Sequence, residues 1–419
     1  MREQIEGSQA VARTVARCRP QVVAAYPISP QTHIVEGLSD LVRMGEVGTC
    51  EYLMVESEFG ALSACIGASA AGARAYTATS SQGLLFMAEA LFNASGLGLP
   101  IVMTVANRAI GAPINIWNDH SDAMSMRDSG WIQLYAASNQ EAADLHVQAF
   151  RLAELLSLPV MVCMDGFVLT HAFEEVDLPE QGSVDRFLPG FTPQQLLDAD
   201  APVTIGAMVG PEAFTEVKYL MHAKQVQALD EIPRLAADFT AQFGRESGGL
   251  LHPYRLDDAE TVVVGLGSML GTLEVVADAL RDAGVSVGVL GIKCFRPWPK
   301  DEVREALRRA HRVVVVEKAF AVGAGGIVGQ NVRLAMQGLP VEVYDVVAGL
   351  GGRPVTTASI RGLLDDVLDQ RLDPLRLHFL DLNAGLVERE LARWRGSERP
   401  GPHAEHMLRD LGAVASRPV

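Results

Sequence analysis

The stretch AAYPISPQTHIVEGL, residues 24–38, joins a short apolar run to a helical pattern through a turn that contains two prolines. Proline fixes its own φ and restricts the residue before it, so Pro27 and Pro30 are expected to hold Ser29 in one place after a strand at Gln21–Ala25. Open α/β sheets place their ligands at the carboxyl ends of such strands. An ordinary strand-to-helix turn is the alternative explanation of these residues taken alone.

Short apolar runs alternate with helical patterns on both sides of this turn. Further strands are predicted at Glu51–Val55, Ala73–Thr79, Ile101–Ala106 and Pro159–Met164, with helices at Ser57–Ala71, Gly83–Asn93 and Glu141–Leu156. Residues 174–200 carry seven acids against one base and are predicted to cross the surface, and residues 211–243 are predicted to be helical. A second alternating block has strands at 261–267, 285–292, 312–318 and 341–347. These patterns predict an α/β protein with two doubly wound, mainly parallel sheets.

Three regions follow from this alternation. Residues 1–245 are predicted to form the first α/β domain with its acidic linker and helical extension, and residues 246–375 a smaller second one. Residues 376–419 form a tail that is poorly suited to a core and could wrap a partner.

Composition limits the classes of partner and compartment. The net charge of −16 argues against nucleic acid and anionic membranes. The first 19 residues, MREQIEGSQAVARTVARCR, are charged throughout, and no apolar run is long enough to span a membrane, so a cytoplasmic protein is expected. The five cysteines lie far apart without a C-x-x-C pair, so we expect this chain alone to hold no metal, no iron–sulfur cluster and no disulfide framework.

The segment GLGSMLG, residues 265–271, has glycines after a strand and before a helix. Its spacing, G-x-G-x-x-x-G, is one residue longer than the dinucleotide fingerprint, and no acid follows on a later strand. A tight strand–helix turn is therefore predicted here, without nicotinamide binding.

Two carboxylates begin the helical pattern in VESEFGALSACIGASAAGARA, residues 55–75. Carboxylates complement a helix N-terminus, an effect worth about 0.3–1 kcal/mol, so capping is the simple explanation of Glu56 and Glu58. Capping accounts for one glutamate more easily than for two beside a helix of small residues.

The segment VANRAIGAPINIWNDHSDAM, residues 105–124, places Arg108 among apolar neighbours at another strand end. A guanidinium there suits bidentate binding of a carboxylate, and a structural ion pair with Asp119 or Asp122 is the alternative. His120 could act as a base, although an exposed loop histidine is the simpler expectation. Ser29, Glu58, Arg108 and Asp119 all follow strands of one sheet and so share one edge.

Longer motifs resemble the α subunit of the pyruvate:ferredoxin oxidoreductase family in its multi-subunit form. They are YPISP (26–30), VESEFGALSACIGASAAGARAYTATSSQGLLFM (55–87), VANRAIGAPINIWNDHSDAM (105–124), DGFVLTH (165–171), FRPWP (295–299) and AGLGGRPVT (348–356). The resemblance implies two domains of the transketolase-like type found in thiamine diphosphate enzymes. It also implies oxidative decarboxylation of a 2-oxoacid to its acyl-coenzyme A.

The resemblance assigns roles to particular residues. Glu58 matches the glutamate that hydrogen-bonds the aminopyrimidine ring, Arg108 the carboxylate-binding arginine and Ser29 the hydroxyl beside the thiazolium. These three are the expected catalytic residues. The expected cofactor contacts are Glu58, Pro27, Ile28, Ser81 and Gln82, and the expected substrate contacts are Ser29, Arg108, Asn107 and Asp119.

The family more often has threonine where this chain has Ser29. Because serine lacks the methyl group of threonine, the substrate pocket gains room for a bulkier 2-oxoacid than pyruvate, such as phenylglyoxylate or a branched-chain 2-oxoacid.

The chain lacks the G-D-G motif with a downstream asparagine that holds magnesium and diphosphate in thiamine enzymes. The resemblance therefore implies that a β subunit supplies Mg²⁺ and the diphosphate half of the site. It also implies a γ subunit and a ferredoxin-like δ subunit carrying [4Fe-4S] clusters, with ferredoxin or another carrier as electron acceptor. A non-catalytic assembly subunit and a thiamine enzyme without electron transfer are the alternatives.

Overall fold

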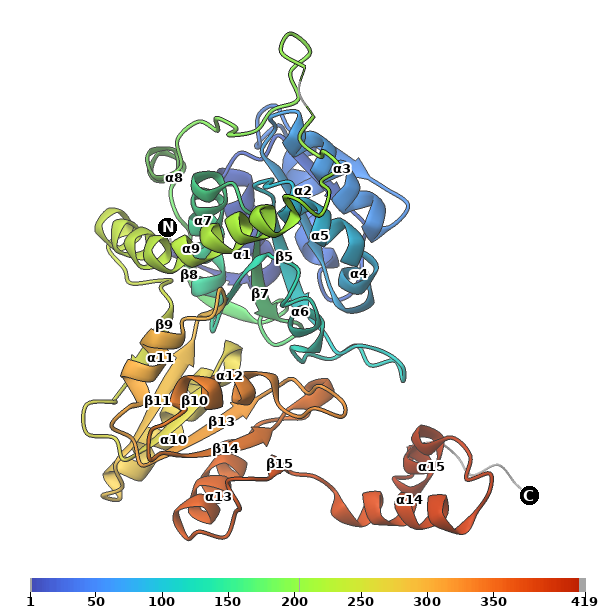
Figure 1. Ribbon diagram of the computed structural model, residues 1–419, viewed down its shortest axis with the longest axis vertical. Coiled ribbons are helices and arrows are strands. Elements are labelled where there is room, and N and C mark those ends of the chain that lie inside the picture. Colours follow the sequence, from blue (N-terminus) through green and yellow to red (C-terminus); the bar gives the residue numbers. More distant parts are fainter. Residues whose placement is uncertain (1, 203, 414–419) are drawn as a thin grey trace.

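The first sheet has seven strands in the order β12-β6-β7-β5-β4-β2-β3 (Figure 1). The computed structural model describes residues 2–202 and 204–413. The strands are β2 (Val22–Ala25), β3 (Glu51–Met54), β4 (Ala75–Thr79), β5 (Val102–Asn107), β6 (Ile132–Tyr135), β7 (Val160–Asp165) and β12 (Cys294–Arg296). All neighbours run parallel except β12, which pairs antiparallel with β6. Strands β4 to β7 are buried along their whole length, which is why their sequences are continuous apolar runs rather than alternating ones.

Helices cover both faces of this sheet. They are α1 (Gly7–Arg17), α2 (Thr32–Arg43), α3 (Glu58–Ala70), α4 (Ser81–Phe86), α5 (Ala88–Gly96), α6 (Ser121–Ser125), α7 (Asn139–Leu156) and the long α9 (Phe214–Phe243). The small residues of α3 let it pack closely on β2 and β4. Helices α1, α2, α7 and α9 share the apolar core of the opposite face. The alternating pattern thus produced the doubly wound sheet that it predicted.

The second sheet has the order β15-β14-β13-β10-β11-β9 and is parallel apart from β9. Its strands are β9 (Leu251–Tyr254), β10 (Thr261–Gly265), β11 (Val287–Ile292), β13 (Arg312–Glu317), β14 (Glu342–Val347) and β15 (Leu377–Phe379). Helices α10 (Leu270–Asp282), α11 (Lys300–Leu307), α12 (Ile327–Met336) and α13 (Thr357–Leu368) flank it, with short 3-10 turns η1 (Gly267–Met269) and η2 (Leu350–Gly352).

The acidic segment 174–200 does not simply cross the surface, and that prediction was wrong in part. Strand β8 (Phe173–Asp177) pairs antiparallel with β1 (Arg2–Glu6), and α8 (Gln181–Phe187) follows. Each strand of this two-stranded ribbon buries one apolar side chain, Ile5 or Val176. A ribbon that covers the core with so few residues leaves no apolar run in the sequence.

The two sheets are not independent of each other. Strand β12 comes from the second alternating block but completes the edge of the first sheet against β6. Phe295 in β12 lies 6.4 Å from Tyr135 in β6, ring centre to ring centre. Both rings belong to one apolar core cluster that runs from the first sheet into the second.

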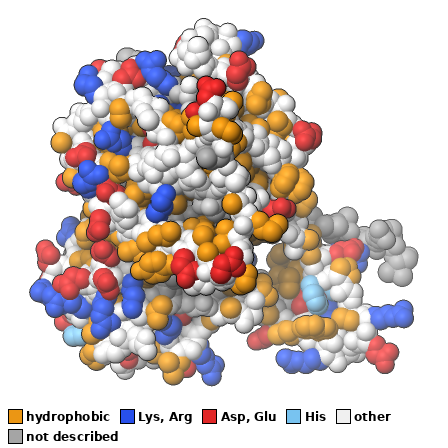
Figure 2. Space-filling view, turned by 45° about the horizontal axis from the view of Figure 1, so that its top comes forward, with side chains coloured by type: hydrophobic (Ala, Val, Ile, Leu, Met, Phe, Trp, Pro, Cys, Tyr) orange, Lys and Arg blue, Asp and Glu red, His pale blue; other side chains and the backbone are white. Residues whose placement is uncertain are grey.

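The C-terminal helices α14 (Ala384–Gly396) and α15 (His403–Asp410) pack against each other and lie away from both sheets (Figure 1). On the face shown in Figure 2, hydrophobic side chains form a band across the middle of the molecule. Four of the five cysteines are buried, and burial raises the pKa of the Cys65 thiol to about 12. No helix in the described part of the chain is long and apolar enough to cross a membrane.

Candidate active site

The carboxyl ends of β2, β3, β4 and β5 lie next to one another, because these strands are neighbours in a parallel sheet. The turns after them carry Ser29, Glu58, Ser81 and Arg108 in that order. The shared edge predicted from the sequence is therefore present in the structure.

Burial separates the two glutamates of α3. Only 8% of Glu58 is exposed, whereas Glu56 lies in solvent. The helix cap is Ser57, whose hydroxyl accepts a hydrogen bond from the Gly60 N–H at 3.1 Å. Among the described residues none donates a hydrogen bond to the Glu58 carboxylate. Capping therefore does not explain Glu58, and its carboxylate is left available to a donor.

A glycine packs closely against this carboxylate. A Cβ atom placed on Gly83, in α4, would lie 2.7 Å from Glu58 Oε1 and 2.6 Å from Thr79 Oγ1. Contacts this short do not occur in folded proteins, so only glycine fits. Thr79 Oγ1 is buried and has no hydrogen-bond partner among the described residues. The Gly83 backbone therefore packs directly between the Glu58 carboxylate and the Thr79 hydroxyl.

Arg108 is the second charged group of this edge, and only 8% of it is exposed. Its Nη1 donates to the Ser29 carbonyl at 2.9 Å and its Nε to the Asn115 carbonyl at 3.2 Å. No carboxylate of the described chain lies within 4 Å of its guanidinium nitrogens, so the alternative of an ion pair with Asp119 or Asp122 is wrong. Burial lowers the pKa of Arg108, and the Asp122 carboxylate partly offsets this. An enclosed guanidinium that binds only neutral carbonyls suits an anionic ligand.

Asp122 ties the turns after β4 and β5 to its own loop, a role that the sequence did not reveal. Its carboxylate accepts hydrogen bonds from the Ser81 N–H (2.9 Å), the Arg108 N–H (3.0 Å), Asn107 Nδ2 (2.8 Å) and the Ala123 N–H (2.7 Å). Burial raises the pKa of Asp122 to about 6 despite these donors. The segment NDHSD offers two aspartates, and its spacing does not distinguish which one accepts the N–H groups of Ser81 and Arg108.

The other predicted cofactor contacts lie around these groups. Ser81 is buried with a left-handed φ of 50°, and its hydroxyl donates to the Ala109 carbonyl at 2.5 Å. The Gln82 amide lies beside Gly111, in the loop that follows Arg108. Pro27 and Ile28 are half-buried, and Ser29 is exposed. Gln31 fixes this turn, since its Nε2 donates to the carbonyls of Tyr26 and Ala78.

Two of the predicted substrate contacts have structural partners instead. The Asn107 amide is fully buried against Asp122, although its Oδ1 has no partner among the described residues. Asp119 accepts hydrogen bonds from the N–H groups of Ser121 (3.0 Å) and Gly351 (3.1 Å). These bonds occupy both Asp119 oxygens and favour a role in holding the loop over direct contact with a substrate.

The second sheet clamps the loop of residues 108–120. Asn115 Nδ2 donates to the Gly351 carbonyl at 3.1 Å, and the His120 N–H donates to the Lys318 carbonyl at 2.8 Å. Gly352 lies so close to Trp117 that an added Cβ would be 2.4 Å from the Trp117 Cβ. The AGLGG turn therefore positions the loop that carries Arg108.

A buried charged cluster continues this junction. Asp165, at the end of β7, contacts His120 Nε2 at 2.6 Å and Lys318 Nζ at 2.8 Å, and it also accepts hydrogen bonds from Asn118 and Ser268. Burial alone would raise the pKa of Asp165, but Lys318 and His120 hold it well below its usual range. The expectation of an exposed His120 was wrong, because 1% of it is exposed. The Gly267 turn packs against this cluster, consistent with a tight turn rather than a nucleotide site.

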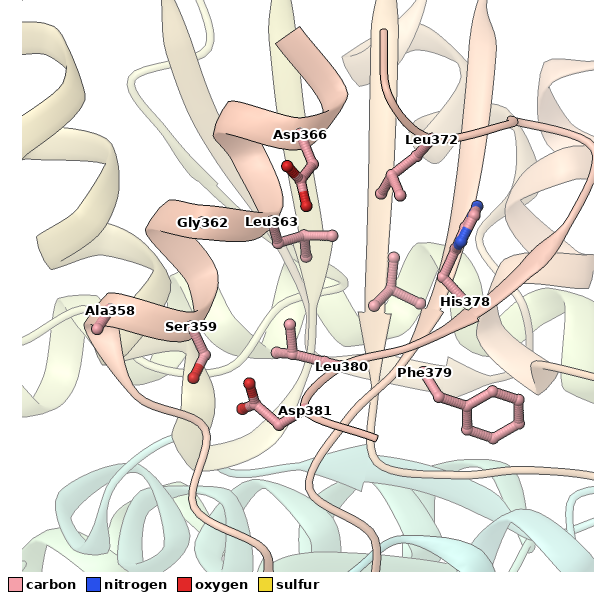
Figure 3. Close-up of a pocket in the computed structure, with 11 residues that line it drawn as sticks. Ala358, Ser359, Gly362, Leu363, Asp366, Leu372, His378, Phe379, Leu380 and Asp381 are labelled. Atoms are coloured by element: carbon pink, nitrogen blue, oxygen red, sulfur yellow. The ribbon is translucent and has the colours of Figure 1, made fainter. Parts of the chain in front are cut away.

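Another groove of the described chain lies away from this edge. It measures about 570 Å³ and is formed by α13 and β15 of the second sheet (Figure 3). Ser359 and Asp366 of α13 face His378 and Asp381 across it. None of the predicted site residues lines this groove.

Comparison with known proteins gives consistent matches over most of the chain. Residues 13–236 match the family model described as pyruvate flavodoxin/ferredoxin oxidoreductase, thiamine diphosphate-binding, and residues 259–360 match pyruvate:ferredoxin oxidoreductase core domain II. Pyruvate synthase subunit PorA of Methanosarcina barkeri is 48% identical, over 91% of this chain and 97% of the relative. Ketoisovalerate oxidoreductase subunit VorA of Pyrococcus abyssi is 38% identical, over 87% of this chain and 92% of the relative.

A solved structure resembles the fold. It is the 2-oxoglutarate:ferredoxin oxidoreductase of Magnetococcus marinus, with a TM-score of 0.66 and 19% identity. The match covers 87% of this chain but only 65% of that one, so the chain spans less than two thirds of its solved neighbour.

Proposed function

Because this chain belongs to the pyruvate:ferredoxin oxidoreductase family, as the α subunit of a 2-oxoacid oxidoreductase, we propose that it supplies the pyrimidine side of a thiamine diphosphate site. The single observation that carries this proposal is the Glu58 carboxylate, which is buried at the carboxyl edge of the sheet and has no donor among the described residues.

The residues at this edge fit the cofactor. An aminopyrimidine presents its N–H groups and ring nitrogens along the edge of a flat ring. Glu58 would accept its ring N–H. The half-buried Pro27 and Ile28 offer an apolar surface at the neighbouring turn.

Bound thiamine diphosphate supplies the carbanion chemistry, and the protein supplies orientation and proton control. Glu58 would hold the proton at the pyrimidine ring nitrogen and so set the ring's tautomer. Arg108 would bind the substrate carboxylate through guanidinium N–H groups that its two carbonyl partners leave free. Ser29 lies where its hydroxyl can approach the ketone, since the same Arg108 holds its carbonyl.

The magnesium and diphosphate half of the site would belong to a β subunit. The absence of the G-D-G motif supports this division, and so does the exposed apolar surface around the edge. This surface includes Tyr26, Met54, Phe59, Phe86, Ile114 and Trp117, each of which is at least 37% exposed. Exposed apolar side chains gathered beside a half-formed site are typical of an interface. Electrons would pass to [4Fe-4S] clusters on other subunits and then to ferredoxin or another carrier, with coenzyme A accepting the acyl group.

Pyruvate is the substrate that we favour, because the pyruvate synthase subunits are among the most similar relatives, at up to 48% identity. A branched 2-oxoacid is the second candidate. The ketoisovalerate oxidoreductase relative, at 38% identity, and the missing methyl group at Ser29 support it.

The test is hydrogen–deuterium exchange at the thiazolium carbon of thiamine diphosphate in the assembled enzyme. Glu58→Gln should slow exchange by about 10²–10⁴-fold, the usual worth of a positioned acid–base group, because an amide cannot hold the proton in the same way. Gly83→Ala should also slow exchange, since its methyl group would displace the Glu58 carboxylate.

The matched controls are Glu56→Gln, which alters an exposed carboxylate two residues away, and Gly67→Ala, which adds a methyl group to α3 where no atom lies within 4 Å. Both should exchange at the wild-type rate. Normal exchange in Glu58→Gln, or a loss confined to Glu56→Gln, would show that the wrong carboxylate was assigned.

A further inference from the structure

Three side chains that are far apart in the sequence meet on the side of the first sheet, and we propose that they bind a divalent transition-metal ion of the zinc class. They are Glu6 at the end of β1, His33 in the first turn of α2 and His171 after β7. One ligand atom from each lies within 4.8 Å of the other two. Two imidazoles and one carboxylate are a donor set that Zn²⁺ and related ions use in proteins.

The individual contacts already approach this geometry. His33 Nδ1 lies 2.7 Å from Glu6 Oε1, and the rings of His33 and His171 are 4.7 Å apart, centre to centre. Ligands on one tetrahedral zinc ion lie about 3.3–3.5 Å from each other, given metal–ligand bonds of about 2.0–2.1 Å. Binding therefore requires the Glu6–His33 hydrogen bond to open by less than about 1 Å. The His33 side chain is 45% exposed, so solvent can reach the ion and fill a fourth position.

Hydrogen bonds to the backbone hold the three ligand-bearing segments together. The Gly7 N–H donates to the Ala172 carbonyl at 3.0 Å, and the Ser8 hydroxyl donates to the Thr170 carbonyl at 2.8 Å. Gln9 Nε2 donates to the His33 carbonyl at 3.2 Å. The segment that follows Glu6 is thus tied directly to the loop of His171 and to the turn of His33. A site whose ligands are held in advance loses less entropy when it binds an ion.

A partner also orients the second histidine. His171 Nδ1 lies 2.8 Å from Thr170 Oγ1, so Nε2 is the ring nitrogen left for an ion. A histidine ligand in proteins is commonly fixed in this way through its other nitrogen. The Phe167 ring, 4.8 Å from His171, packs on one side of the ligand. This arrangement explains why three titratable groups meet here although the proposed reaction uses none of them.

The experiment uses the full chain, freed of metal with a chelator and titrated with Co²⁺, whose visible absorption reports its ligands. We expect one equivalent of Co²⁺ to bind with bands typical of nitrogen and oxygen ligands, and Zn²⁺ to displace it. Each of Glu6→Gln, His33→Gln and His171→Gln should weaken Co²⁺ binding by more than about tenfold. The matched control is His222→Gln, on the exposed surface of α9, which should bind as the wild type does.

A second measurement keeps the proposal testable if a variant fails to fold. X-ray absorption at the zinc edge of the wild-type chain, loaded with one equivalent of Zn²⁺, should show scattering from two imidazoles. The proposal is overturned if the wild type shows no saturable binding, if the three variants bind as well as the control, or if the spectrum lacks the imidazole signals. The cluster would then be a histidine–glutamate hydrogen bond only. Neither result bears on Glu58, so this site and the proposed function stand or fall separately.

Discussion

At the scale of the residue, the chemistry of this chain depends on which charged groups are buried without a charged partner. Glu58 and Arg108 are each only 8% exposed, and no charge of the described chain pairs with either side chain. Burying an unpaired charge is costly, so such groups persist where a ligand supplies the missing partner. Asp165 shows the opposite case, since Lys318 and His120 satisfy it from within the chain.

The first prediction concerns Arg108 and Ser29, the two groups that we propose contact the substrate. Arg108→Ala should mainly raise KM for the 2-oxoacid, by about 30- to 1,000-fold, because a charge-assisted contact to the carboxylate is worth about 2–4 kcal/mol. Ser29→Ala should mainly lower kcat, because a hydroxyl directed at developing charge matters most in the transition state. Steady-state kinetics of the assembled enzyme measure both.

Arg108→Lys separates charge from geometry, since lysine keeps the charge but cannot donate to Ser29 and Asn115 in the same fork.

Ser29→Thr tests the size of the pocket. It should favour pyruvate over a branched 2-oxoacid or phenylglyoxylate by about 1–3 kcal/mol at most. An unchanged ratio of kcat/KM for the two substrates would mean that Ser29 does not line the pocket.

At the scale of the element, turns and loops set the geometry of the site. The η2 turn of the second sheet packs on the loop of Arg108 through Gly351 and Gly352. The loop itself is poor in regular structure, and its position depends on these contacts. A substitution in the η2 turn of the second sheet should therefore change KM for the 2-oxoacid.

Gly352→Ala tests this coupling. The added methyl group would meet Trp117 Cβ at 2.4 Å, so the loop must move, and KM for the 2-oxoacid should rise by about tenfold or more. The matched control is Gly338→Ala. Its φ of 82° is nearly the same as the 81° of Gly352, but no atom lies within 4 Å. Both variants carry the same backbone strain, so equal effects on KM would contradict the clamp.

A pH dependence is expected from α7. His146 is fully buried, with Nδ1 2.7 Å from the Ala142 carbonyl and Nε2 2.5 Å from Thr104 Oγ1, and burial lowers its pKa to about 4. The unfolded chain binds this proton near pH 6.5, so His146 makes stability fall as the pH drops from 6.5 towards 4. Its contribution to the slope of the free energy of unfolding against pH approaches about 1.4 kcal/mol per pH unit.

Urea unfolding of the wild type and of His146→Gln at several pH values measures this effect. Glutamine can keep one hydrogen bond but does not titrate, so the two free energies of unfolding should converge as the pH falls from 6.5 to 4. A constant difference across this range would contradict the assignment.

At the scale of the whole molecule, the two sheets act as one body. Strand β12 comes from the second block of the sequence but completes the first sheet, and one apolar cluster runs through both. The ion pair of Asp165 and Lys318 joins the end of β7 to the second sheet. Removing one partner of such a buried pair is strongly destabilising, because it leaves an uncompensated charge.

Lys318→Met should therefore destabilise the chain by about 3–5 kcal/mol, measured by chemical denaturation. The double variant Lys318→Met/Asp165→Asn should recover part of that loss, because it removes the unpaired charge. Arg361→Met, which breaks the exposed pair with Asp365, is the matched control and should cost less than about 1 kcal/mol. Equal losses in the single and double variants would mean that the charge itself does not matter.

The sequence alone determined the doubly wound α/β class, most strands of both sheets and the edge that carries the site, but it did not indicate β6, β9, β12 or β15. Buried parallel strands need continuous apolar runs, and the turns after them need proline, glycine and hydroxyl residues in fixed places, so YPISP and the segment around Arg108 were readable directly. The ribbon of β1 and β8 was not, because each of its strands buries a single apolar residue.

Only the tertiary structure decided which groups are buried and what they meet. Glu56 and Glu58 look alike in sequence, and packing against α4 distinguishes them. Asp122 binds the turns after β4 and β5. Lys318 pairs with Asp165, which is 153 residues away in the sequence, and β12 adds to the first sheet although its sequence lies in the second block. Contacts between residues so far apart leave no local pattern, because each depends on where the other segment comes to lie.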